Sequence, residues 1–211
     1  MHCILCNDRQ IWNPLKTARA KAMKRLPEIT PEAMDPDQRK FYESVISGPR
    51  GKFGGPFPAL LHSPLLGNQV QTLGEMLRFH SSLDAGHREM AILVVARHWQ
   101  SQVEWNAHVV IALDLGVSAD TIRQIRDWPN EIDAEPAEQA VYRFARELLT
   151  DKKLSPQSYQ NMLQFAEMKE LVDLIVLLGY FDLLSMLLNT FEVEARPDDG
   201  IPPDDLLLEI D

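Results

Sequence analysis

The chain has 211 residues, of which 45% are hydrophobic and 25% charged, the balance of a globular protein that is long enough to bury a core. Its formal net charge of −10 argues against nucleic acid or an anionic membrane as the main partner. A locally basic pocket for an anionic substrate remains compatible with that charge.

The sequence predicts neither a membrane-spanning nor a disulfide-stabilised protein. Its longest apolar run, residues 174–181, is far shorter than the roughly 20 residues of a transmembrane helix. The N-terminus lacks the continuous apolar segment of a signal peptide. The only two cysteines, Cys3 and Cys6, lie together at one end, where they cannot crosslink a fold. We therefore expect a cytoplasmic protein in a reducing environment.

Composition divides the chain into three parts. Residues 1–23 are basic and lack an apolar period, which predicts a disordered extension and makes Met23 a candidate for the natural start. Residues 24–195 have the helical pattern of a single domain. Residues 196–211 are rich in Pro and acidic side chains, and we expect them to wrap around the domain or to fray.

Capping residues and helix breakers then locate a series of helices. Asp35, Pro36 and Gln38 combine an N-cap, a proline at the first helical position and a glutamine at N3. Seven of the eleven residues 48–58 are Gly or Pro, which predicts an irregular loop that is either a lid over a site or a plain connector. The expected helices span residues 36–47, 64–81, 84–100, 102–115, 118–127, 136–150, 155–166 and 168–193, the last with a break near Gly179. Because no strand alternation appears, we predict an all-α fold.

A weak internal repeat occurs at an offset of 81 residues. Glu89 aligns with Glu170, and His108 aligns with Asn189, within two apolar stretches of similar length. So few matches can arise by chance, and an internal duplication is left open. If the duplication is real, the second copy has lost the histidine and is structural.

The most informative pattern in the chain is the pair Glu104 and His108. At a spacing of four residues, a carboxylate and an imidazole lie on the same helix face, about 6 Å apart at their Cβ atoms. Glu89 lies fifteen residues before Glu104, in the preceding apolar helix. Three groups that can transfer protons thus occur close together in segments otherwise built for a core. Each also has an ordinary interpretation: an ion pair for Glu89, a solvated helix position for Glu104 and a satisfied core imidazole for His108.

These residues belong to a longer motif. Residues 88–116 contain R-E-x-A-I-L-x-V-A, a turn, and E-W-x-x-H-x-x-x-A-x-x-x-G. The motif resembles that of the carboxymuconolactone decarboxylase family, which is related to alkylhydroperoxidase D, and the resemblance extends to Gly55–Pro64 and Leu188–Val193. It covers residues 24–195 and implies an alkylhydroperoxidase D-like helical domain that forms a homo-oligomer.

The chain departs from the peroxidase branch of this superfamily at the redox positions. There the motif has cysteines twelve and fifteen residues after the glutamate, and a histidine nineteen residues after it. Here those positions hold Ser101, Glu104 and His108. A thiol peroxidase needs a nucleophilic and a resolving thiol, so alkylhydroperoxidase-like activity is the less favoured alternative. A redox pair of Cys3 and Cys6 is disfavoured because it lies in the N-terminal extension.

The decarboxylase branch is similar in its Glu-Trp-x-x-His segment, here Glu104, Trp105 and His108. The family reaction removes CO₂ from a carbon vinylogous to a lactone carbonyl, and the lactone accepts the electrons, so no cofactor is required. The resemblance implies acid–base catalysis by Glu89, Glu104 and His108 on a small carboxylated lactone or a related aromatic-degradation intermediate. A non-catalytic oligomeric binding protein is a third interpretation.

Other residues are candidates for substrate binding. Arg97 or Arg78 could hold a substrate carboxylate, and Trp105 could form a wall of the pocket. His62 and His80 are weaker candidates, since His62 leads into a helix cap and His80 suits a helix C-terminus. Glu104 and His108 also form half of a metal site, but no further ligand pair completes it, so we predict no metal.

Overall fold

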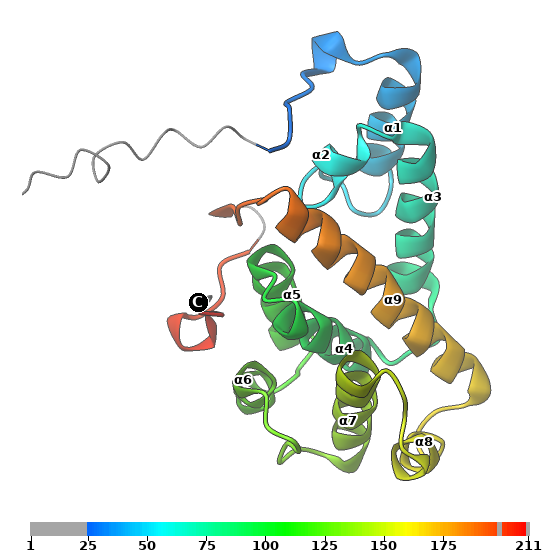
Figure 1. The fold of residues 1–211 in the computed structure, drawn as a ribbon, viewed down its shortest axis with the longest axis vertical. Helices are drawn as coiled ribbons and strands as arrows, with labels where there is room; N and C mark the ends of the chain where they lie inside the picture. Colours follow the sequence, from blue (N-terminus) through cyan, green and yellow to red (C-terminus); the bar gives the residue numbers. More distant parts are fainter. Residues whose placement is uncertain (1–24, 198–199, 210–211) are drawn as a thin grey trace, which may run out of the picture.

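The computed structural model describes residues 25–197 and 200–209 (Figure 1). Within those ranges it contains helices and no strand, so the all-α prediction is confirmed. The predicted extension 1–23 and the candidate start at Met23 lie outside the described residues. The elements in chain order are η2 (Pro31–Ala33), α1 (Pro36–Ser47), α2 (Phe57–Leu60), α3 (Pro64–Glu75), the π-helical turn η3 (Met76–His80), α4 (Ala85–His98), α5 (Gln102–Asp114), α6 (Ala119–Asp127), α7 (Pro136–Asp151), α8 (Pro156–Met162), α9 (Met168–Thr190) and η5 (Asp204–Leu206).

Helix α4 forms the centre of the fold. Every residue from Glu89 to Ala96 is buried. The helix packs against α5, α6, α7 and α9, so it is covered on all sides (Figure 1). A helix in that position needs apolar side chains around its whole circumference, which explains why this segment shows no amphipathic pattern. Against that background, the glutamate at its centre is conspicuous.

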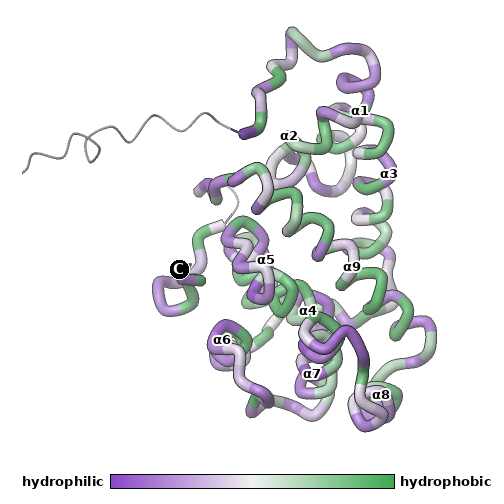
Figure 2. The backbone as a smooth tube through the Cα atoms, viewed as in Figure 1, coloured by the Kyte–Doolittle hydropathy of each residue, from purple (hydrophilic) through white to green (hydrophobic). Residues whose placement is uncertain are grey.

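Helix α9 is apolar along most of its length (Figure 2). It is the one described helix that is long and apolar enough by composition to cross a membrane, although half of its most apolar window is buried and the helix packs against α4. A helix over residues 168–193 is predicted from the sequence without a membrane span, because Asp173 and Asp182 delimit its central apolar run. The predicted break at Gly179 is wrong, because the helix continues through this residue. Gly179 is exposed, and a Cβ added there would meet no described atom within 4 Å.

The proposed duplication does not correspond to a structural repeat. Glu89 and His108 lie on two helices, α4 and α5, which a short turn folds against each other. Their counterparts, Glu170 and Asn189, lie at opposite ends of the single helix α9. Nineteen residues of helix separate them by about 28 Å at 1.5 Å per residue. The sequence match therefore reflects two apolar segments of similar composition, not two copies of one unit.

The structure gives the start of α1 and the end of α3, and the second of these bears on the site. The predicted start of α1 is correct, since Asp35 Oδ1 accepts from the backbone N–H of Gln38 at 2.8 Å and the Gln38 side chain accepts in return at 3.0 Å. Helix α3 ends at Glu75, earlier than predicted, and continues as the π-helical turn η3. A π-turn shifts the register of the following side chains and occurs often at functional sites. Here it contains Arg78.

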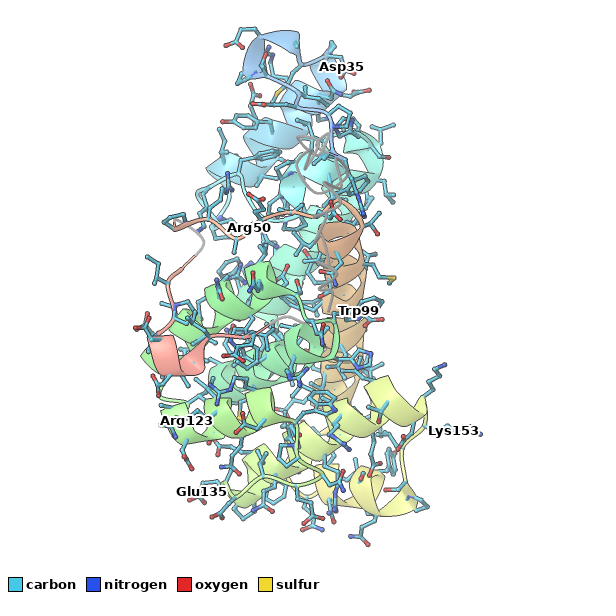
Figure 3. All side chains as sticks on the ribbon, turned by 60° about the vertical axis from the view of Figure 1, so that its left-hand side comes forward. Asp35, Arg50, Trp99, Arg123, Glu135 and Lys153 are labelled. Carbon is cyan, nitrogen blue, oxygen red and sulfur yellow. The ribbon has the colours of Figure 1, made fainter. Side chains whose placement is uncertain are left out.

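The C-terminal segment 200–209 packs against α5 and α6. Leu206 and Leu208 are buried, and the indole N–H of Trp105 donates to the carbonyl oxygen of Leu206 at 2.8 Å. The described part of the predicted tail thus wraps around the domain. Figure 3 shows Asp35 and Glu135 at opposite ends of the molecule, with Arg50 between them.

Candidate active site

His108 lies between two carboxylates where α4 and α5 pack together. Its Nδ1 lies 2.5 Å from Oε2 of Glu89, and its Nε2 lies 3.4 Å from Oε2 of Glu104. Glu104 and His108 come from one face of α5, as their spacing predicts. Glu89 comes from the buried centre of α4. The structure therefore brings together the three residues that the sequence analysis selected for proton transfer.

The three side chains are buried, and their charges act on one another. Burial alone lowers the pKa of His108, but the carboxylates of Glu89 and Glu104 outweigh it, so the net pKa is raised above its ordinary value. Burial alone raises the pKa of Glu89, but His108 and the guanidinium groups of Arg78 and Arg88 lower it overall. Arg88 Nε also lies 3.2 Å from Oε1 of Glu89. Both shifts favour an imidazolium beside a carboxylate.

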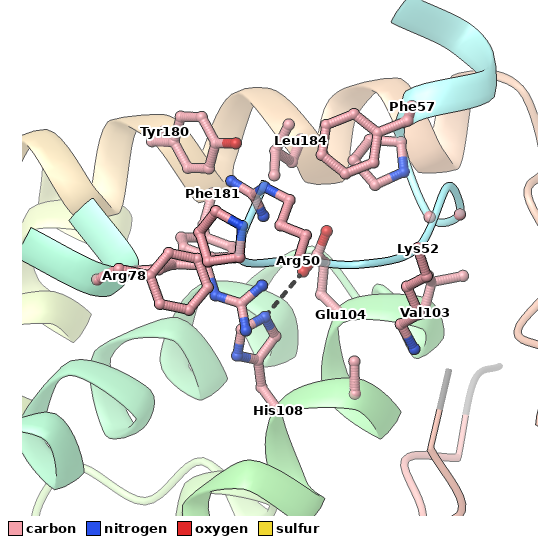
Figure 4. A pocket seen from close by; sticks show the side chains of 16 residues that line it. Arg50, Lys52, Phe57, Arg78, Val103, Glu104, His108, Tyr180, Phe181 and Leu184 are labelled. Carbon is pink, nitrogen blue, oxygen red and sulfur yellow. Dashed lines mark ion pairs between the residues drawn. The ribbon is translucent and has the colours of Figure 1, made fainter. Parts of the chain in front are cut away.

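A cavity of about 250 Å³ lies beside Glu104 and His108 (Figure 4). Phe181 forms part of its wall, and the ring of Phe181 stands edge-on to the imidazole with centroids 5.0 Å apart. Glu89 does not line this cavity. Nδ1 of His108 thus faces away from the cavity toward Glu89, whereas Nε2 faces the side that Glu104 lines. The two ring nitrogens therefore have different surroundings.

The cavity is basic although the whole chain is acidic. Among the residues that the structure describes, Arg50, Lys52 and Arg78 line it together with one carboxylate, that of Glu104. Burial and the nearby charge of Arg50 lower the pKa of Arg78, and Glu89 and Glu104 oppose this shift. A guanidinium nevertheless stays protonated in proteins. The surplus of positive charge favours an anionic ligand.

The other predicted binding residues lie outside this cavity. Arg97 donates to the carbonyl oxygen of Arg126 at 2.5 Å, and its guanidinium lies over the ring of Trp128. The fully buried Trp105 packs in the core. Exposed His62 lies 2.9 Å from the carbonyl oxygen of Pro27, and exposed His80 ends the turn η3. Of the two arginines weighed for a substrate carboxylate, only Arg78 reaches the cavity.

Arg50 and Tyr180 also line the cavity, and neither was predicted from the sequence as a binding residue. Arg50 was considered only as part of the Gly- and Pro-rich loop. Residues 49–57 of that Gly- and Pro-rich loop and the start of α2 supply much of one wall of the cavity. Tyr180 enters from α9, next to Phe181. The signal for Tyr180 in the sequence is a lone hydroxyl within a long apolar run, which alone indicates nothing about a site.

Comparison with known proteins identifies the family motif. Residues 64–147 match the model of the carboxymuconolactone decarboxylase family, and this segment runs from the start of α3 into α7. Over this segment the chain resembles the carboxymuconolactone decarboxylase family. A search of curated proteins found no significant match to this chain.

A solved structure shows the same fold. It is that of an alkylhydroperoxidase AhpD core, described as an uncharacterized peroxidase-related protein from Ralstonia eutropha JMP134. The TM-score is 0.70, with 17% sequence identity, over 88% of this chain and 97% of that chain. At this identity the likeness establishes the fold only.

Ser101 and Glu104, which stand where the peroxidase motif has cysteines, have different surroundings. Ser101 is the N-cap of α5 and is buried, and its hydroxyl has no hydrogen-bond partner among the described residues. It does not line the cavity, whereas Glu104 does. No cluster of three metal-ligating side chains occurs in the part of the chain that the structure describes.

Proposed function

We propose that the protein is a cofactor-independent acid–base enzyme that acts on a small carboxylated lactone or a related aromatic-degradation intermediate, most simply as a decarboxylase. The observation that supports this most is His108, buried with a carboxylate at each ring nitrogen and facing a basic cavity through Nε2. The match of residues 64–147 to the family model supports an enzyme-related function, and the reaction itself is our proposal.

The proposed reaction balances without an external oxidant or reductant. The bond between the substrate carbon and its carboxylate breaks, CO₂ leaves, and the electron pair passes into the lactone as a dienolate. Nε2–H of His108 then donates its proton to the carbon, and solvent reprotonates the imidazole. The guanidinium of Arg78, which lines the cavity, stabilises the negative charge on the enolate oxygen.

The two carboxylates have different roles in this proposal. Glu89 lies outside the cavity and accepts from Nδ1–H of His108, so it is a positioning residue that fixes the ring and its charge. Glu104 lines the cavity at 3.4 Å from Nε2, where it can pass a proton to or from the imidazole. Loss of Glu89 should change the pH profile, and loss of Glu104 should change the rate of proton transfer.

A pH–rate profile on a panel of lactone acids tests this proposal. We expect kcat to fall by about 10²–10⁴ in His108→Ala and in Glu104→Gln, the usual contribution of a positioned acid or base. His87→Gln is a matched control on α4, because His87 is partly exposed and does not line the cavity. Losses below about 10-fold in both site variants would place the chemistry elsewhere.

A peroxidase is the second candidate, favoured by the shared fold of the peroxidase-related protein. Consumption of a hydroperoxide with a dithiol reductant tests it, and we expect no turnover because the motif positions hold Ser101 and Glu104. A non-catalytic binding protein is the third. Unchanged ligand affinity in His108→Ala, with no reaction of any panel member in the wild type, would favour that function.

We also propose that the protein forms a homo-oligomer. One face of α9 packs in the core, yet its opposite face is apolar and exposed. The exposed side chains follow helical spacing along one stripe: Met168, Val172, Ile175, Val176, Leu183 and Met186. Such a contiguous patch is typical of an interface, and a second copy of this chain is the simplest occupant.

A further inference from the structure

The cavity has a second group of polar side chains besides Glu104 and His108. Arg50 from the loop after α1 and Tyr180 from α9 meet there (Figure 4). Tyr180 is only 4% exposed. Its hydroxyl, and Nε and Nη2 of Arg50, are buried without a hydrogen-bond partner of good geometry among the described residues. Buried donors are nearly always paired, so three unpaired donors in one cavity need an explanation.

The backbone is built to leave room for these two groups. Gly74 of α3 lies directly behind them. A Cβ at this position would collide with the hydroxyl of Tyr180 and would lie 2.5 Å from Nη2 of Arg50. No other residue fits there without displacing both donors. Gly74 lies in the last turn of α3, and a glycine at a helical position lowers helix stability, so its presence is best explained by the space it provides.

The chemistry of the pair fits an anionic oxygen. Burial raises the pKa of the Tyr180 hydroxyl and the charge of Arg50 opposes that rise, so the hydroxyl is protonated at neutral pH and can donate. The guanidinium of Arg50 is held over the ring of Phe57, 5.1 Å from its centroid. An arginine and a hydroxyl together recognise a carboxylate through charge-assisted hydrogen bonds. An anion would satisfy the unpaired donors and offset their desolvation.

We propose that Arg50 and Tyr180, arranged around Gly74, form an anion-binding subsite of the cavity that holds a carboxylate of the substrate. The assignment rests on the proposed function only in naming the ligand as a substrate. Arg78 lies close enough to interact with both Arg50 and Glu104, so it connects the subsite to the proton-transfer residues. Arg50 and Tyr180 are then specificity-determining residues, and Phe57, Phe181 and Leu184 contact the apolar body of the ligand.

Binding of 4-fluorobenzoate and of its neutral isostere 4-fluorobenzamide, followed by ¹⁹F NMR, tests the subsite without requiring turnover. We expect the wild type to bind the benzoate at least 10-fold more tightly than the benzamide. Arg50→Gln and Tyr180→Phe should each weaken benzoate binding by about 10-fold, the scale of a hydrogen bond to a charged group. Gly74→Ala should do the same by displacing both side chains.

Gly179→Ala is the matched control for Gly74→Ala. It lies beside Tyr180 on α9, and an added Cβ there meets nothing within 4 Å. Benzoate affinity should be unchanged in this variant. His108→Gln should also retain benzoate binding within about 3-fold, because the subsite does not include the imidazole.

The outcomes separate this inference from the proposed function. Equal affinity for benzoate and benzamide, or full benzoate affinity in both Arg50→Gln and Tyr180→Phe, overturns the subsite. Loss of binding in His108→Gln alone would also overturn it, because the anion would then lie at the proton-transfer residues. Benzoate binding that depends on Arg50 and Tyr180, in a protein that turns over no lactone acid, would support the subsite and contradict the proposed reaction.

Discussion

The ion pair of Glu89 and His108 should give the protein a characteristic dependence of stability on pH. The raised pKa of His108 contributes stability that is fully present below the unfolded value of 6.5 and is lost as pH rises through the folded value. The lowered pKa of Glu89 contributes stability that is present above 4.5 and is lost as pH falls through the folded value. The pair therefore stabilises the fold most between these two pH values.

Substitution Glu89→Gln tests this reasoning. Removal of one partner of a buried ion pair typically costs about 3–5 kcal/mol. Here Glu104 remains 3.4 Å from Nε2, so we expect the lower end of that range near pH 6. The loss should shrink as pH rises above 6.5, by at most about 1.4 kcal/mol per pH unit for one proton, because the unfolded chain then releases the His108 proton that the folded wild type still holds.

Urea unfolding followed by the helical circular dichroism signal, from pH 5 to pH 9, measures both curves. The difference between the wild type and Glu89→Gln isolates this pair from the other titrating groups. His87→Gln, on the same helix but partly exposed, should give a curve parallel to that of the wild type. If the curves of the wild type and Glu89→Gln run parallel across this range, His108 is not held as an imidazolium and the electrostatic reasoning is wrong.

Three further predictions concern the scaffold. Ile175→Glu, in the middle of the exposed stripe of α9, should reduce the mass measured by light scattering to that of a monomer, and an unchanged mass would exclude this face as the interface. Leu206→Ala should lower the free energy of unfolding by about 2–5 kcal/mol, because this side chain is 1% exposed. A loss below about 0.5 kcal/mol would show that residues 200–209 do not stabilise the domain. Asp35→Ala should cost about 1 kcal/mol in the same urea assay through loss of the α1 cap, and Asp35→Asn should restore most of it.

The sequence predicted those parts of the molecule that depend on local chemistry. Caps such as Asp35 and Ser118 mark helix starts because their side chains bond to the backbone three residues on. The spacing of Glu104 and His108 fixes a shared helix face for the same local reason. A helix–turn–helix that packs α4 on α5 then brings Glu89 to the imidazole.

The rest of the cavity depends on contacts between distant segments. Arg50, Arg78 and Tyr180 come from a loop, a π-helical turn and the last long helix, which no spacing rule relates. Arg97 was an equally good candidate by sequence. Its contacts with the carbonyl oxygen of Arg126 and with the ring of Trp128 depend on where α6 ends, which the spacing of residues does not show. A break was predicted at Gly179 because glycine has a poor helix propensity. The helix continues because packing of α9 against α4 outweighs that preference.

The two ring nitrogens of His108 lie at different distances from their carboxylate partners, and this difference suits a general acid. An imidazolium that is paired tightly on both sides would be stable but would release its proton slowly. Here the tight contact, 2.5 Å to Glu89, is on the side away from the cavity, where it maintains the charge without competing for the transferable proton. The longer contact, 3.4 Å to Glu104, is on the side where a ligand would lie. Glu104, which lines the cavity, is therefore the carboxylate placed to exchange a proton with His108 in the proposed reaction.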